Sequence, residues 1–483
     1  MGSLKKQTIS GVKWLVSSSF LQKVILTAST VVLARILGPS EFGLFALAFV
    51  AIDALSLFKS MGFDSALIQR KDDIEKAANT AFFIIPAFGI MLYLILTISA
   101  PWIGNFLNNQ DVAGIIKALG IIFVISCLGR VPAALLEKNM QFKQISIIEI
   151  STTVVYAVGA LTFALLKFGV WSLVIAYILK TIYQNTLTFV YAKWRPRFEF
   201  DKKIALEMFH FGKFLFLSGG IWFLKMNLDN LLVGKLLGVT ALGLYAIAFN
   251  VANFGADYFG DKIMRVTYPA YARLQNDLYD LQQASLKVFK HVSLVAIPFG
   301  VGIFLLGEEL LRFIYGEKWI AAAGILKILA WAGIFNTMST AIGGIFLACG
   351  KSKLGFLIIS LQVAIFFVFI MPMAKLFGLN GVGAVVSISG FIIFVVALLA
   401  VNKLISLNLN QIYLSFKSSL VPSLVMASGI ILLKNTTYCF RHILLPYYNF
   451  IILSGSAVII YTLSLYILER SLFKNIKEGL FNG

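Results

Sequence analysis

Long apolar runs separated by short polar segments fill this chain from one end to the other. A helix needs about 20 apolar residues to cross the hydrocarbon layer of a membrane. Strands of a membrane barrel would alternate in polarity over about ten residues, whereas these runs are continuous. The pattern therefore predicts an all-α integral membrane protein with about fourteen transmembrane helices. Their expected limits are 11–35, 41–62, 78–103, 112–136, 145–166, 169–191, 205–236, 240–261, 286–311, 320–347, 354–374, 380–402, 413–433 and 446–468.

One segment is written twice along the chain. "VVLARILGPSEFGLFALAFV" occupies 31–50, and "LLVGKLLGVTALGLYAIAFN" occupies 231–250. Seven of the thirteen positions from Leu37 to Phe49 are identical in the second copy. Six predicted spans separate the copies, and an even number preserves the orientation of the repeat. We therefore expect two parallel repeats related by an axis along the membrane normal, with a site where they face each other.

The repeat divides the chain into three predicted parts. These are an N-terminal six-helix bundle (1–195), a C-terminal six-helix bundle (196–405), and two additional helices with a cytoplasmic tail (406–483). All loops are short, which leaves no room for a folded domain outside the membrane.

The repeated segment also has a local logic, because each copy joins two predicted helices through a short turn. Gly38 and Gly238 suit the left-handed conformation that ends a helix. Ser40, like its counterpart in the second copy, suits the N-cap of the helix that follows. Gly43 and Gly243 would let that helix approach a neighbour closely.

Composition and charge agree with lipid as the solvent. The chain is 59% hydrophobic and only 13% charged, against about 25% charged residues in soluble domains. A net charge of +19 would suggest nucleic acid in a soluble protein. Here most lysines and arginines lie in the loops of one predicted side, so membrane topology explains the charge and no nucleic acid is expected. The positive-inside rule then predicts a multi-pass membrane protein with both termini in the cytoplasm.

Several charged side chains fall inside the predicted spans, where each costs several kcal/mol unless it faces a cavity or a partner. We interpret one group as a cationic cavity for an anionic headgroup, consisting of Lys23, Lys180, Lys225 and Arg130. A second group is a candidate for ion coupling and consists of Asp53, Asp229, Asn253 and Asp257. The simpler reading stays open, because Lys225 could neutralise Asp229, Lys23 could pair with Asp53, and Arg130 could reach the interface.

Four stretches carry a resemblance to a known family. They are "LARILGPSEFGLFALA", "VPAALLEKNMQF", "GVWSLVIAY" and "NLDNLLVGKLLGVTALGLYAIA". They resemble the bacterial polysaccharide flippases, which are the Wzx-type proteins of the multidrug/oligosaccharidyl-lipid/polysaccharide exporter superfamily. The resemblance covers roughly residues 5–405.

The resemblance implies two six-helix bundles in a V, as in MATE transporters, with two extra C-terminal helices. It implies export of an undecaprenyl-pyrophosphate-linked oligosaccharide, for exopolysaccharide or O-antigen, by alternating access. It also implies a protein that is not an enzyme and uses no cofactor. A coupling ion (H⁺ or Na⁺) and a polysaccharide polymerase are its candidate partners.

Three other functions compete with this one. A drug or cation antiporter of the same fold would favour an acidic cavity, and the lysines within the spans argue against it. A membrane glycan polymerase or glycosyltransferase usually needs paired acidic residues or a sizeable outer loop, and neither is visible. A scaffold without transport would tolerate loss of the buried charges. The three cysteines and three histidines show no spacing typical of a disulfide framework or a metal site.

Overall fold

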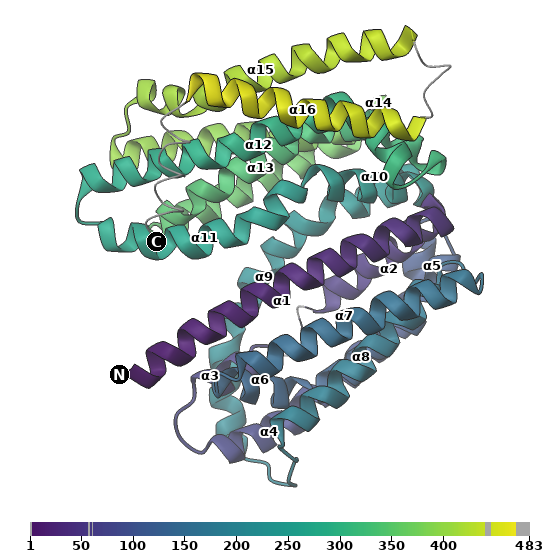
Figure 1. Ribbon diagram of the computed structural model, residues 1–483. Coiled ribbons are helices and arrows are strands. Elements are labelled where there is room, and N and C mark those ends of the chain that lie inside the picture. Colours follow the sequence, from purple (N-terminus) through teal and green to yellow (C-terminus); the bar gives the residue numbers. More distant parts are fainter. Residues whose placement is uncertain (1, 57, 60, 440–445, 470–483) are drawn as a thin grey trace. The chain divides into compact units, whose positions relative to one another are not determined.

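The computed structural model describes residues 2–56, 58–59, 61–439 and 446–469. Within these ranges, side chains are not described at 2–10, 12, 211–222, 257–262, 265–266, 352, 409, 437–439 and 446–448. Helices joined by short loops make up the described chain, and no strand occurs in it (Figure 1). This confirms the predicted all-α fold.

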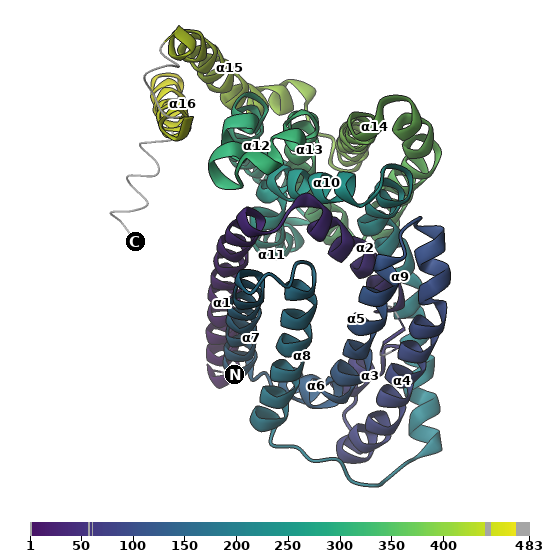
Figure 2. The ribbon, with the colours of Figure 1, turned by 90° about the vertical axis from the view of Figure 1, so that its right-hand side faces the viewer.

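The contacts between residues divide the chain into two compact units, Met1–Gly243 and Leu244–Gly483. The predicted boundaries at 195/196 and 405/406 follow the sequence repeat instead, and they stay a prediction. In the first unit α1 packs on α7, α7 on α8, and α5 on both α8 and α4, as Figure 2 shows for the bundle. The helices of this unit are α1 (Gly2–Ile36), α2 (Pro39–Ser56), α3 (Phe63–Gln69), α4 (Ile74–Phe106), α5 (Asp111–Leu128), α6 (Arg130–Lys138), α7 (Phe142–Leu165), α8 (Trp171–Ala192) and α9 (Lys202–Leu237).

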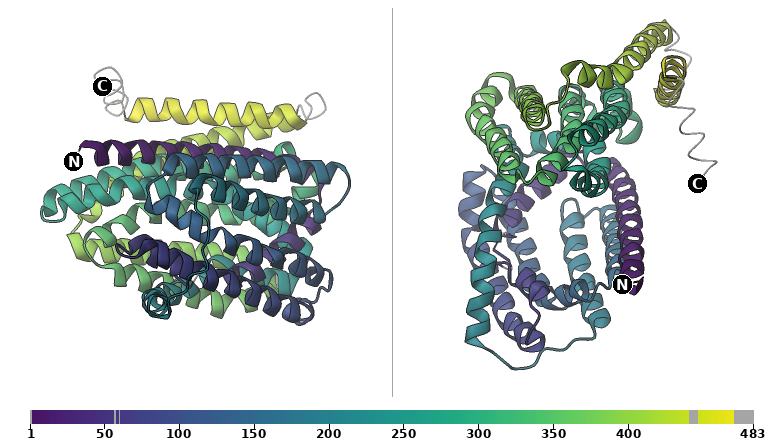
Figure 3. Two further views of the ribbon diagram at one scale, coloured as in Figure 1. Left: turned by 90° about the horizontal axis from the view of Figure 1, so that it is seen from below. Right: turned by 90° about the vertical axis from the view of Figure 1, so that its left-hand side faces the viewer.

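The second unit is organised around α13, which packs on α11, α12 and α14. Helices α15 and α16 lie against each other and against α12, and Figure 3 shows them in yellow at the edge of this unit. The helices from the unit boundary onward are α10 (Val239–Ala252), α11 (Phe254–Leu274), α12 (Leu278–Ile314), the 3₁₀ helix η1 (Glu317–Ala322), α13 (Ala323–Ala348), α14 (Ser352–Ile405), α15 (Leu409–Cys439) and α16 (Pro446–Leu468).

All fourteen predicted spans overlap helices, but the described residues contain eleven helices that are long and apolar enough to cross a membrane. The count of fourteen is therefore not confirmed. Two predicted spans, 354–374 and 380–402, fall on α14, whose backbone leaves the helical region at Gly378 (φ 58°). Another, 240–261, is divided between α10 and α11 at Asn253. Hydropathy marks an apolar run, but it does not report a break inside one.

The predicted span 112–136 is likewise two helices, α5 and α6, separated at Gly129. The break is filled by Asn185 of α8, whose side-chain amide donates a hydrogen bond to the carbonyl oxygen of Ile125. A Cβ on Gly129 would collide with the Asn185 side chain. The missing side chain at Gly129 thus makes room for an amide from another helix, which the local sequence does not reveal.

The two copies of the repeat meet inside the first unit. A Cβ on Gly43 would collide with the carbonyl oxygen of Val239, and a Cβ on Gly243 would collide with the carbonyl oxygen of Pro39. The contacts are reciprocal, so corresponding turns of the two copies cross at their shared glycine. The predicted close approach is confirmed, and the neighbour in each case is the other copy.

The caps of these turns differ in part from the prediction. Gly238 has a positive φ (87°), but its ψ of 173° lies outside the left-handed helical region, and Gly38 has no positive φ, so the predicted left-handed caps are not found. Ser40 does not cap α2; its hydroxyl donates to the Glu41 carboxylate, which also accepts from the backbone N–H of Gly38 at 2.9 Å. The prediction for Ser40 was wrong because Pro39, with its fixed φ, already begins the helix one residue earlier.

The glycine crossing yields a stability prediction. We expect Gly43→Ala to lower the free energy of unfolding by about 1–3 kcal/mol, because a methyl group would be forced against the backbone of the other copy. Gly114→Ala is the matched control, since a Cβ on this helical glycine meets nothing within 4 Å. The control should be neutral or stabilising by about 0.5–1 kcal/mol. Thermal unfolding of both purified variants measures the difference, and equal midpoints would contradict the crossing.

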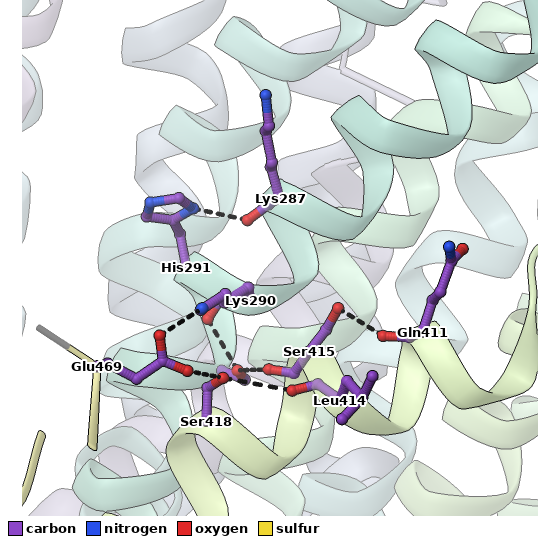
Figure 4. A network of polar contacts seen from close by, with 9 residues as sticks. Lys287, Lys290, His291, Gln411, Leu414, Ser415, Ser418 and Glu469 are labelled. Atoms are coloured by element: carbon purple, nitrogen blue, oxygen red, sulfur yellow. Dashed lines mark hydrogen bonds and ion pairs between the residues drawn. The ribbon is translucent and has the colours of Figure 1, made fainter. Parts of the chain in front are cut away.

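Ion pairs fix the C-terminal helices to α12 in the second unit. Lys290 of α12 lies 2.8 Å from the Glu469 carboxylate, directly after α16, and Ser418 of α15 donates to the same carboxylate (Figure 4). Lys434 of α15 pairs with Glu309 of α12 at 2.7 Å. Partial burial opposes ionisation of Glu469, but the hydrogen bonds from Lys290 and Ser418 and the Lys290 charge hold its pKa below the usual value.

The Glu469 network predicts a pH-dependent contribution to stability. Since the folded-state pKa of Glu469 is lowered, its contribution is present above the unfolded value of about 4.3 and is lost as pH falls through the folded value. Glu469→Gln should cost about 1–3 kcal/mol at pH 7, and the gap to the unmodified protein should close on acidification. Thermal unfolding from pH 7 to about pH 3, below the ordinary pKa of a glutamate, tests this. A gap that does not change with pH would rule out the network as its cause.

Candidate functional site

Lys180, on α8 within the first unit, lies between two tyrosine rings. Its Nζ is 5.1 Å from the ring centre of Tyr177, one turn earlier on α8, and 5.8 Å from that of Tyr156 on α7. The two rings stand edge to face with centres 6.2 Å apart. In the described part of the chain, no carboxylate forms an ion pair with this half-buried ammonium. The sequence predicted a cation here, and the structure adds the two tyrosine rings that contact it.

The aromatic contacts offset part of the cost of the charge. A lysine at the centre of a membrane helix costs about 2.5–3.5 kcal/mol, and a cation–π contact returns from about 0.5 kcal/mol when exposed to about 2 kcal/mol when desolvated. The two tyrosines therefore recover between about a third of this cost and nearly all of it. A cation held by aromatic faces, with no ion pair in the described part of the chain, remains available to an anionic ligand.

Asp53 joins Lys180 and its tyrosines from α2. Its carboxylate is close enough to the Tyr177 hydroxyl for the two groups to interact electrostatically. Phe49, one turn earlier on α2, packs edge-on against Tyr177 with ring centres 4.8 Å apart. We call Asp53, Tyr156, Tyr177 and Lys180 the Lys180 cluster. It contains one basic side chain, one acidic side chain and two aromatic rings, contributed by three helices.

A second polar contact in this unit links α1 to α7. Gln22 donates a hydrogen bond of 3.0 Å to the carboxylate of Glu149. Lys23 follows Gln22 and is half-buried. The contact joins α1 to α7, which also carries Tyr156 two turns beyond Glu149.

Lys225 and Asp229 lie one turn apart on α9. Asp229 is only 4% exposed, and its carboxylate accepts a hydrogen bond from the backbone N–H of Asn230 at 2.8 Å. Lys225 is half-buried. Both residues belong to the first unit, but the described contacts do not connect them to the Lys180 cluster.

Asn253 has a structural partner in the second unit. It lies in the break between α10 and α11, where its side-chain oxygen accepts a hydrogen bond of 2.7 Å from Asn336 of α13. Its amide donates to the carbonyl oxygen of Phe249 at 3.1 Å. The repeat aligns Asn253 with Asp53, but here the polar position joins helices at a break. Asp257 lies outside the residues whose side chains are described.

Arg130 begins α6 and forms an ion pair with Asp64 of α3, whose side chain is 13% exposed. The structure thus gives Arg130 a carboxylate partner near the interruptions of two helices. It is not brought together with Lys180.

Three residues of this region were missed by sequence reasoning, namely Tyr156, Tyr177 and Glu149. Tyr177 precedes Lys180 by three residues, so helical spacing places both on one face, and that signal was available. Glu149 is an acid within a predicted span, which is a signal of the same kind. Tyr156 lies on another helix, and only tertiary packing brings it to Lys180.

Comparison with known proteins adds a family. The protein family described as "Polysaccharide biosynthesis protein" matches residues 32–324. The teichuronic acid biosynthesis protein TuaB of Bacillus subtilis (strain 168) is 28% identical over 440 residues, covering 89% of this chain and 89% of the relative. The lipopolysaccharide biosynthesis protein WzxC of Escherichia coli (strain K12) is 28% identical over 360 residues, covering 73% of this chain and 72% of the relative.

A solved structure shares the fold. The lipid II flippase MurJ in an inward closed conformation matches with a TM-score of 0.79, covering 95% of this chain and 99% of that one. Sequence identity to it is 15%, so the likeness concerns the helical architecture alone.

The net cost of Lys180 can be measured through stability. We expect Lys180→Met to leave the free energy of unfolding unchanged or to raise it by about 1–2 kcal/mol, because the variant removes a desolvated charge that forms no ion pair within the described residues. Lys434→Met is the control: it breaks the ion pair with Glu309 and should destabilise. Thermal unfolding of the two variants in one detergent compares them. A loss with Lys180→Met as large as with the control would show that Lys180 serves packing.

Proposed function

The chain belongs to the polysaccharide biosynthesis protein family, and we propose that this multi-pass membrane protein is a transporter that flips a lipid-linked oligosaccharide across the membrane. The proposed substrate is a glycan on undecaprenyl pyrophosphate, moved from the cytoplasmic to the outer leaflet of a bacterial or archaeal cytoplasmic membrane. The names of the relatives support a polysaccharide as cargo. The helical architecture shared with a lipid II flippase supports flipping.

The Lys180 cluster is the observation that carries this proposal. Its ammonium has no ion-pairing acid within the described residues, and it lies in an aromatic setting inside a helical bundle. In a medium of low dielectric constant, an ammonium attracts phosphate far more strongly than in water. Tyrosine faces beside it suit the stacking of a sugar ring. An exporter of cations would be poorly served by this charge, which speaks against the antiporter alternative.

Alternating access needs an element that packs tightly in one state and separates in another. We infer that the crossing of the repeated turns at Gly43 and Gly243 is such an element, because it depends on two backbones in direct contact. With both termini in the cytoplasm, as the basic loops indicate, this crossing would close the outer side.

The driving force and the partners are further parts of the proposal. Asp53 and Asp229 are the candidates to bind H⁺ or Na⁺, because both are acids withdrawn from bulk solvent on helices of the first unit. Asn253 is engaged with Asn336 and suits this role less. A polysaccharide polymerase would consume the flipped product. The proposal assigns no catalytic residue.

Transport in reconstituted vesicles tests the proposed function. We expect Lys180→Gln to lower the rate of flipping of a fluorescent polyprenyl-pyrophosphate oligosaccharide at least about tenfold, which corresponds to the loss of one charge-assisted hydrogen bond. Lys180→Arg should retain part of the rate because it retains the charge.

Lys71→Gln, at an exposed loop position, is the matched control and should transport normally. Surface glycan in cells that carry each variant as the only copy gives an independent readout. Normal flipping by Lys180→Gln at normal protein levels would refute the role of the cluster, and absence of flipping by the unmodified protein would refute the function.

A further inference from the structure

Two cations of the first unit approach each other where two helices are interrupted. Lys59 lies in the segment between α2 and α3, and Arg130 is the first residue of α6, directly after the break at Gly129. The two charges are close enough to repel each other. The sequence left open that Arg130 reaches the membrane interface, and in the structure its charge acts on that of Lys59.

The backbone at this point is held in place by contacts with other helices. The Cys127 thiol of α5 contacts the carbonyl oxygen of Lys59 at 3.6 Å, which ties the two interruptions together. The Asn185 side chain fills the break at Gly129. Helix α3 packs against α6. The proximity of the two cations is therefore built into the packing of α5, α6 and α8.

The acids nearby neutralise only one of these charges. Asp64 pairs with Arg130 through Nη2, and its other oxygen accepts from the backbone N–H of Ser65 at 2.9 Å. Glu137, two turns along α6, also favours the Arg130 charge. The buried Nε of Arg130 has no hydrogen-bond partner among the described residues. Over the same residues, no oxygen accepts a hydrogen bond from the Lys59 ammonium.

The Lys59 ammonium keeps most of its charge at neutral pH. Burial is the main cause that lowers its pKa, the Arg130 charge lowers it further, and the result is about 8. Two like charges in a partly buried setting repel each other more strongly than they would in water. An anion that contacts both would turn this repulsion into attraction.

We propose that Lys59 and Arg130 form a binding site for a phosphate or pyrophosphate group, separate from the Lys180 cluster. Lys59 supplies a mobile point charge, and Arg130, oriented by Asp64, supplies the guanidinium N–H groups that Asp64 leaves unused. If the proposed function holds, the ligand is the pyrophosphate of the lipid-linked glycan. Because Arg70 directly follows α3 and belongs to the side of the membrane where basic residues are most frequent, this site would receive the headgroup on the cytoplasmic side. The headgroup of an anionic phospholipid offers the same chemistry.

Titration calorimetry on the full-length protein in phosphatidylcholine nanodiscs tests the site. Inorganic pyrophosphate and undecaprenyl pyrophosphate are the two probes. Lys59→Met should weaken the binding of both at least about tenfold, the loss expected for one charge-assisted hydrogen bond. Since Arg130 alone cannot be removed without stranding Asp64, the double variant Arg130→Gln/Asp64→Asn is the second test, and it should weaken binding similarly.

Lys71→Met, an exposed loop variant, should bind like the unmodified protein, and the thermal midpoint confirms that each variant is folded. Nanodiscs with phosphatidylglycerol form a second arm. If this lipid competes with pyrophosphate in the unmodified protein but not in Lys59→Met, the phosphate site holds and a phospholipid also occupies it.

Unchanged pyrophosphate affinity in both test variants overturns the site. If Lys180→Gln then loses affinity while Lys59→Met does not, the proposed function stands and this inference fails. If the unmodified protein binds neither probe, both fail.

Discussion

Hydrocarbon as the solvent is the constraint on which the rest of this structure depends. It requires every backbone hydrogen bond to be made within the chain, and helices alone satisfy that requirement segment by segment. It also removes hydration from any charged side chain inside a span. A cationic side chain within the helices either forms an ion pair with an acid or remains at a cost in desolvation free energy. Cations of the first kind serve the structure, whereas those of the second kind are candidates for ligand binding.

Matched pairs occur in both units. Arg130 pairs with Asp64 in the first unit, and in the second Lys290 with Glu469 and Lys434 with Glu309 join the C-terminal helices to α12. Two lysines of the first unit are unmatched in this sense. Lys180 has aromatic faces and Lys59 has a like charge beside it, and neither forms an ion pair within the described residues. Removing a matched charge strands its partner, whereas removing an unmatched one relieves a cost. That asymmetry makes the unmatched lysines the better candidates for ligand binding.

The repeated turn shows how a duplicated sequence becomes a structural device. Gly43 and Gly243 are equivalent in the repeat, and each lies against the backbone of the other copy. Pseudo-symmetry makes such a contact self-complementary, so the same glycine position of the repeat forms both halves of the contact. The repeat is not faithful everywhere: where the first copy has Asp53 near Tyr177, the second has Asn253 bonded to Asn336 at a helix break. At this position of the repeat the first unit thus has an acid, whereas the second unit has an asparagine that is hydrogen-bonded to another helix.

The sequence by itself determined the helical membrane class, the approximate position of each helix, and the presence of lysines and acids within the spans. It could do so because hydropathy is a local property, summed over about 20 neighbouring residues. It also foresaw the close approach at Gly43 and Gly243, since a glycine in a helix leaves room for a neighbouring backbone. Tertiary structure alone decided the partners: Tyr156 beside Lys180, Asp64 on Arg130, and Asn185 in the break at Gly129. Each of these contacts joins residues on different helices. Their proximity depends on how the helices rotate and pack, and residue spacing along the sequence does not report this.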